Sequence, residues 1–204
     1  MKYSICVSGA ASGDTVEPAK ELAERLGVAI AKHGHTITTG ATVGLPFFAA
    51  KAASDAGGMS VGFSPASSLR EHAYKYRLPI GVYDFINFTG MHYVGRDVHL
   101  VQSSDAIITI GGRFGSLHEF TTALESYMPC GVLLGSGGTA DEIPELMRDL
   151  EFTNKKLVIF DENPERLVAT VIDRLDKEFK DIDTHALKRH WLREIPKKSH
   201  KQRG

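Results

Sequence analysis

The feature that most restricts the fold is a short β-rich run, Ala106 to Ile110, that leads directly into two glycines. Such a run is typical of a strand covered on both faces of a parallel sheet. Short runs of this kind alternate along the chain with longer segments of helical period. The expected strands are residues 2–8, 35–39, 59–63, 83–88, 106–110, 131–134 and 157–160, and the expected helices are residues 16–32, 45–56, 94–102, 116–127, 140–150 and 164–179. This alternation predicts an α/β fold with a single Rossmann-like, doubly wound, mostly parallel sheet and helices on both faces.

The chain has 204 residues, of which 42% are hydrophobic, and this is enough to bury one sheet between two helix layers. We expect one nucleotide- or phosphate-binding domain over residues 1–180. A basic C-terminal tail follows over residues 181–204, with too little apolar content to fold by itself. Residues 64–82 show no steady period and predict a long surface loop. Because such long connections are often functional, this loop is a candidate for covering a ligand or making a dimer contact.

The charge and the cysteine content exclude several classes of protein. The formal net charge is -1, so no global field draws the protein onto nucleic acid or anionic lipid. Trp191 and the cations of the tail are compatible with RNA contact, but a solvated terminus is the favoured interpretation. Cys6 and Cys130 lie in strand-like runs, where a thiol behaves as a small buried hydrophobe, and no long apolar stretch is present. These features predict a reduced, cytoplasmic protein without a membrane segment.

Three glycine corners follow expected strands, at residues 8–12, 38–44 and 111–116. Ligands of open parallel sheets bind beyond the carboxyl ends of the strands, where glycine lets backbone N–H groups approach an anion. An ordinary βα turn explains any single corner equally well, but three corners together favour a phosphorylated ligand. The candidate phosphate- or nucleotide-binding residues are Ser8, Gly9, Gly40, Gly44, Thr89, Gly111, Gly112, Gly115 and Ser116.

Several familiar cofactor and metal patterns do not occur. The first corner lacks the GxGxxG fingerprint, and no GxxxxGK[ST] loop occurs, so neither NAD nor a P-loop nucleotide is supported. His92, His99 and His118 are not spaced as metal ligands, and no HExxH or CxxC is present. We therefore expect no cofactor and no metal.

Glu119 and Arg96 are the candidate catalytic residues. Glu119 follows Ser116 at the spacing of a capping box, so a helix cap and a catalytic carboxylate are equally supported. Arg96 falls early in an expected helix, where an arginine is usually solvated, but its guanidinium also matches phosphate geometry at this sheet edge. Asp97 beside it is explained by the helix dipole alone.

Residues 104–119 resemble the PGGxGTxxE signature of the LOG ("lonely guy") family, once labelled lysine-decarboxylase-like. The segment Gly95-Arg96-Asp97 resembles that family's arginine segment, and the likeness spans roughly residues 3–175. Ile110 stands in place of the family's proline, and Ser116 in place of its threonine. The sequence is also similar to a branch that includes the molybdenum cofactor carrier proteins.

The resemblance implies a homodimer or higher homo-oligomer that hydrolyses the N-glycosidic bond of nucleoside 5'-monophosphates. It assigns catalysis to Arg96 and Glu119, and the phosphate to Gly111, Gly112, Gly115 and Ser116. The alternative is a carrier or sensor that holds a nucleotide or a molybdenum cofactor-like ligand in the same place without chemistry. The residues alone support phosphate binding more strongly than turnover.

Overall fold

The computed structural model describes residues 1–150, 155–180 and 182. The strands are β1 (Ser4–Gly9), β2 (Thr36–Thr39), β3 (Met59–Ser64), β4 (Phe85–Phe88), β5 (Ala106–Ile110), β6 (Cys130–Leu133) and β7 (Val158–Asp161). The helices are α1 (Lys20–Lys32), α2 (Leu45–Asp55), α3 (His92–Gln102), α4 (Phe114–Glu125), α5 (Thr139–Asp149) and α6 (Pro164–Glu178). Two short turns are added, the π-helical η1 (Glu71–Lys75) and the 3-10 turn η2 (Lys155–Leu157).

The strands form one sheet in the order β4-β3-β2-β1-β5-β6-β7, and every pairing is parallel. The predicted Rossmann-like, doubly wound α/β fold is thus confirmed, with a sheet that is wholly parallel. From β1 the chain adds strands outward to β4 and then returns to place β5 on the other side of β1. The strand order therefore reverses between β1 and β5, which is where open α/β sheets bind ligands.

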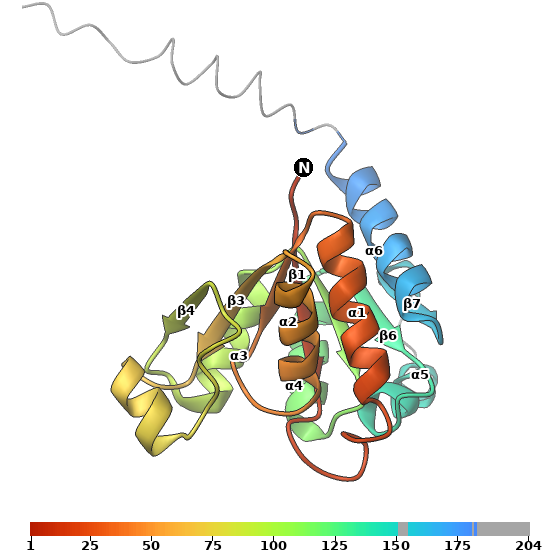
Figure 1. The fold of residues 1–204 in the computed structure, drawn as a ribbon. Helices are drawn as coiled ribbons and strands as arrows, with labels where there is room; N and C mark the ends of the chain where they lie inside the picture. Colours follow the sequence, from red (N-terminus) through yellow and green to blue (C-terminus); the bar gives the residue numbers. More distant parts are fainter. Residues whose placement is uncertain (151–154, 181, 183–204) are drawn as a thin grey trace, which may run out of the picture.

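Helices cover both faces of the sheet (Figure 1). One core lies under α1, α2 and α6 and includes Ile5, Val7 and Ile108 from the central strands. The other lies under α3, α4 and α5 and includes Cys6, Ile107 and Phe120. Alternate residues of β1 and β5 enter opposite cores because strand side chains point alternately to the two faces. Cys6 and Cys130 are both free and buried, as predicted.

Several element boundaries differ from the sequence-based expectation. The first helix begins at Lys20 rather than residue 16, because residues 14–19 form turns instead of a regular helix. The fourth helix begins at Phe114 rather than Ser116, and the fourth strand begins at Phe85 rather than residue 83. The segment 64–82, predicted as a loop, contains η1, and the side chain of His72 within this turn is buried.

Within the described residues no helix is both long and apolar enough to span a membrane. The predicted basic tail lies outside the described residues, apart from residue 182.

Candidate functional site

A cavity of about 220 Å³ opens at the carboxyl edge of the sheet, where the strand order reverses. Its walls come from the loops after β1 and β2 and from the first turns of α3 and α4. Six predicted site residues line it: Gly9, Gly40, Arg96, Gly115, Ser116 and Glu119. The structure therefore brings predicted residues from four segments, the end of β1, the loop after β2, α3 and α4, into one small polar cavity.

Arg96 lies in the second turn of α3 with its guanidinium packed against the backbone of β2's glycine corner. A Cβ at Gly40 would lie 1.6 Å from Arg96 Nη1, so only glycine leaves room for the guanidinium. Nη1 donates a hydrogen bond to the Phe63 carbonyl at 3.3 Å, and Nε lies 3.0 Å from Asp97 Oδ1. That N–H is not directed at the carboxylate, so the Arg96–Asp97 contact is an ion pair without a well-formed hydrogen bond. Arg96 is only 5% exposed, which makes the solvated interpretation wrong.

Glu119 points from α4 toward the end of β1 and accepts a hydrogen bond from the Ser8 hydroxyl. Because α4 begins at Phe114, Glu119 lies in its second turn and is not a capping residue, so the capping-box hypothesis is wrong. Burial is the main cause that raises the pKa of Glu119 to about 7. The positive charge of Arg96 and the Ser8 hydrogen bond lower this pKa, whereas the charge of Asp97 and a hydrogen bond with its carboxyl raise it.

Gly115 and Ser116 line the cavity and lie in the first turn of α4, where backbone N–H groups have no partner within the helix. These donors, together with the positive end of the helix dipole, suit an anion. Gly112, with φ 104°, is held from behind, since a Cβ at Gly138 would lie 2.3 Å from its carbonyl oxygen. The Gly112 carbonyl accepts from the Thr139 N–H at 3.1 Å. The start of α4 is therefore fixed by the loop that follows β6.

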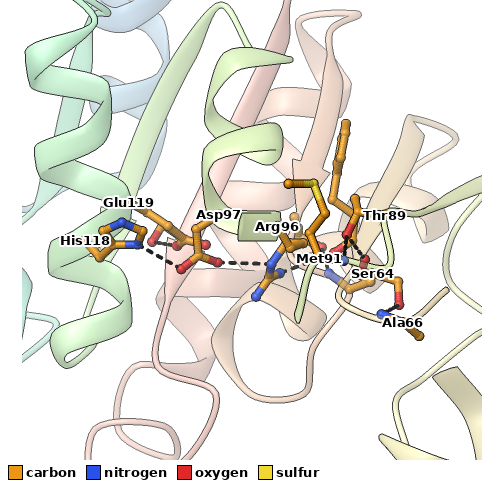
Figure 2. Close-up of polar contacts among 12 residues, drawn as sticks. Ser64, Ala66, Thr89, Met91, Arg96, Asp97, His118 and Glu119 are labelled. Carbon is orange, nitrogen blue, oxygen red and sulfur yellow. Dashed lines mark hydrogen bonds and ion pairs between the residues drawn. The ribbon is translucent and has the colours of Figure 1, made fainter. Parts of the chain in front are cut away.

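Four other predicted phosphate-binding residues have internal roles in this structure. The Ser8 hydroxyl is engaged by Glu119, and the Gly111 N–H donates to Ser136 Oγ at 2.8 Å. Gly44, with φ 80°, lies against the Ala10 carbonyl, and a Cβ added at Gly44 would lie 2.2 Å from the Ala10 carbonyl oxygen. The Thr89 hydroxyl donates to the Ser64 carbonyl at 2.7 Å, on the far side of Arg96 from Glu119 (Figure 2). Their predicted contact with phosphate stays a prediction.

Two residues that the sequence analysis explained otherwise join the site. Asp97 is 5% exposed, and its second oxygen, Oδ2, lies 3.1 Å from His118 Nδ1 (Figure 2). A helix-dipole role does not account for this burial. Asp97 and His118 belong to neighbouring helices, α3 and α4, and no sequence motif links them.

Arg113 and Tyr93 also line the cavity and were missed. Arg113 spans its mouth, donating from Nη2 to Ser12 Oγ at 2.9 Å. The Tyr93 ring centre lies 5.8 Å from the Arg96 guanidinium carbon and 5.7 Å from the Tyr76 ring. Tyr76 belongs to the 64–82 segment, which therefore packs against the start of α3. Their positions in the sequence could have identified them, since Tyr93 and Arg113 lie at the starts of helices at the ligand-binding edge of the sheet.

The comparisons with known proteins agree with this architecture. An uncharacterized protein of Archaeoglobus fulgidus is 32% identical over 114 residues, which is 56% of this chain and 70% of that protein. The structure is similar to the molybdenum cofactor carrier protein of Chlamydomonas reinhardtii (27% identity, TM-score 0.69), covering 85% of this chain and 98% of that one. It is also similar to the molybdenum cofactor binding protein of Rippkaea orientalis (26% identity, TM-score 0.69), covering 86% and 98%.

Residues 2–168 match the model of the SLOG cluster4 family. The superfamily predicted from the glycine loop is thus confirmed, while the narrower LOG assignment stays a prediction. The loop also departs from PGGxGTxxE in length, because two residues, Arg113 and Phe114, stand between the glycine pair and Gly115. On the extent of the family match, this chain belongs to the SLOG cluster4 family.

Proposed function

We propose that this protein binds a nucleoside 5'-monophosphate at the carboxyl edge of β1 and β5 and hydrolyses its N-glycosidic bond. The observation that carries the proposal is the buried Glu119 carboxyl, which shares one cavity with Arg96 and the first turn of α4. A site that only holds an anion gains nothing from a buried acid beside it, since its charge would repel the ligand. An acid with a pKa near neutrality is what proton transfer requires.

The phosphate is assigned to the N–H groups of Gly115 and Ser116, with Arg113 at the mouth of the cavity. Arg96 lies deeper and offers its guanidinium to a ribose or base oxygen. With the phosphate at the helix terminus, the sugar extends toward Glu119. This placement uses both ends of the cavity for one ligand.

The chemistry follows from the state of Glu119. Its raised pKa, caused mainly by burial, leaves a substantial protonated fraction at neutral pH. Glu119 gives this proton to the base as the C–N bond breaks, and the carboxylate that remains stabilises the positive charge on the sugar. Water then bonds to the anomeric carbon and loses a proton to solvent. The products are the free base and ribose 5-phosphate.

Release of the free base from a panel of nucleoside 5'-monophosphates tests this function. We expect turnover with at least one member, and a loss of about 10²- to 10⁴-fold in Glu119→Gln, because the amide cannot supply the proton. Glu142→Gln, at an exposed position on α5, is the matched control and leaves the rate unchanged. Absence of turnover with every nucleotide contradicts the proposal.

The second candidate is a carrier of a molybdenum cofactor-like phosphorylated ligand. It is favoured by the similarity to the carrier protein and the binding protein described above, each of which aligns over 98% of its own length. The same phosphate site would serve it, without a role for proton transfer by Glu119. Tight binding of the cofactor, unchanged in Glu119→Gln and accompanied by no base release, would select the carrier.

The homodimer implied by the family resemblance is kept as part of the proposal. Phe114 and Val94, at the starts of α4 and α3, are 88% and 70% exposed and flank the site. Apolar side chains exposed to this degree around a binding site are typical of a contact surface. Light scattering of the purified chain should give twice the mass of one chain, and a monomer that still releases base would remove the dimer from the account.

A further inference from the structure

Asp97 lies between Arg96 and His118 in a line of polar side chains (Figure 2). Its Oδ1 lies 3.0 Å from Arg96 Nε and its Oδ2 lies 3.1 Å from His118 Nδ1. The Asp97 side chain is 8% exposed, whereas that of His118 is 38% exposed. His118 is thus the point at which this line of groups meets solvent.

Glu119 lies in the same buried cavity as Asp97. Two elements pack against its carboxyl, β1 with Ser8 and Cys6, and α3 with Arg96 and Asp97. Among the described residues, the Ser8 hydroxyl donates a hydrogen bond to it, and the Asp97 carboxyl lines the same cavity (Figure 2). In the part of the chain that the structure describes, Glu119 is the side chain to which the Ser8 hydroxyl bonds. Asp97 therefore provides the connection from the Glu119 cavity to His118.

We infer that Asp97 and His118 form a proton relay that returns a proton from solvent to Glu119 after each turnover. The inference rests on the proposed hydrolysis. His118 takes a proton from solvent at Nε2 and gives the one on Nδ1 to Asp97 Oδ2. Asp97 passes a proton to the Glu119 carboxylate and is then a carboxylate again. His118 is left with its proton on Nε2 and regains the Nδ1–H tautomer by exchanging protons with solvent. The proton given to the base is thereby replaced by one from solvent, and the attacking water's proton goes to solvent.

The arrangement matches what such a relay needs. The Glu119 and Asp97 carboxyls line the same small cavity (Figure 2), so a proton can pass between them without rearrangement of the chain. Arg96 Nε lies beside Asp97 Oδ1, which leaves Oδ2 to face His118. His118 is the partly exposed group of the line, and its imidazole has two ring nitrogens that can each carry a proton.

A purely structural role for Asp97 makes different predictions. If Asp97 only orients Arg96, its contact with His118 is incidental, and removal of the imidazole alters neither turnover nor proton exchange. The two roles are therefore separated by changing His118 and leaving Asp97 and Arg96 in place.

The test is His118→Ala, compared with His99→Ala on the solvent-exposed side of α3. In weak buffer we expect base release by His118→Ala to fall at least about tenfold, with KM for the nucleotide unchanged. Added imidazole should restore the rate with saturation, and His99→Ala should behave as the unchanged protein. Full activity in His118→Ala, or a loss that imidazole does not restore, overturns the relay.

A second measurement keeps the relay testable if no nucleotide is hydrolysed. Infrared detection of the protonated Glu119 carboxyl after a pH jump follows proton exchange directly, with Glu119→Gln identifying the band. The relay predicts exchange at least about tenfold slower in His118→Ala and faster again with imidazole. Equal exchange rates in the two proteins contradict the relay, whereas absent hydrolysis with slowed exchange contradicts only the proposed function.

Discussion

The cluster around Glu119 and the cluster around His72 lie at the same edge of the sheet, and both are buried (Figure 2 shows part of each). In the second cluster, His72 Nδ1 lies 2.8 Å from Ser64 Oγ and Nε2 lies 3.0 Å from the Pro79 carbonyl oxygen. The Thr89 hydroxyl also belongs to this cluster and donates a hydrogen bond to the Ser64 carbonyl. Each ring nitrogen of His72 thus has one neutral partner.

The Glu119 cluster differs because it holds charges that are not balanced pair by pair. Glu119 and Asp97 are neighbouring acids with one buried arginine, and the Arg96 Nε–H has no well-directed acceptor among the described residues. Burial of such groups destabilises a fold unless they are fully paired. A cluster with satisfied neutral bonds fixes a segment of chain, whereas one with unsatisfied charge indicates a binding or catalytic site.

Replacing His72 should give the largest loss of stability. His72→Ala leaves a cavity and unpaired groups at Ser64 and Pro79, so the free energy of unfolding should fall by about 2–5 kcal/mol. Base release measured below the unfolding temperature should stay near that of the unchanged protein. Urea unfolding and the base-release assay together check this, and a selective loss of activity without loss of stability would place His72 in the site.

Gly40→Ala should disturb the Glu119 cluster by steric overlap with Arg96. The new Cβ would lie 1.6 Å from Arg96 Nη1, which forces the guanidinium out of its position. We expect about 1–3 kcal/mol of destabilisation and at least tenfold weaker nucleotide binding, measured by calorimetry. Gly81→Ala, where a Cβ meets open space, is the control and should change neither quantity. Unaltered binding in Gly40→Ala would show that the position of Arg96 does not matter.

The pH dependence of stability should report the charge in the Glu119 cluster. Burial raises the pKa of Glu119 from 4.5 to about 7, so the folded protein binds this proton more tightly than the unfolded chain does. Its contribution to stability is therefore greatest below pH 4.5 and is lost as the pH rises to about 7. Relative to the unchanged protein, Glu119→Gln should become progressively more stable across this window in urea unfolding. A difference that is independent of pH would mean that Glu119 titrates normally.

Arg113→Ala should give the smallest effect. Arg113 is exposed and bonds to Ser12 across the cavity mouth, so its removal should leave thermal unfolding unchanged. Loss of one charged contact to phosphate should weaken ribose 5-phosphate binding about tenfold. Equal affinity in the variant would confine phosphate binding to the backbone of α4.

The sequence predicted the sheet well because its signals are local. The β-rich run 106–110 and the glycine loop after it can be recognised from one continuous segment of the sequence. Because parallel strands place all their carboxyl ends at one edge of the sheet, the position of the loops then follows. Glu119 and Arg96 were predicted as a pair on this basis and on family resemblance. Their meeting in one cavity required only that the strand order reverse at β1.

The remaining contacts depend on packing between elements, which no single segment encodes. Asp97 and His118 meet because α3 packs against α4, and Gly138 supports Gly112 because the loop after β6 packs behind the loop after β5. The error in the start of α4 had a local cause. Ser116 is a favoured capping residue, but the helix begins two residues earlier without a side-chain cap.

A crystal structure with ribose 5-phosphate tests the central claim most directly. The account predicts phosphate oxygens about 3 Å from the N–H groups of Gly115 and Ser116, with the anomeric carbon facing Glu119. The Arg113 guanidinium should turn from Ser12 to the phosphate. A phosphate bound elsewhere, for example in the groove between α4 and α5 lined by Leu117 and Leu146, would contradict the assignment of the cavity at β1 and β5 as the functional site.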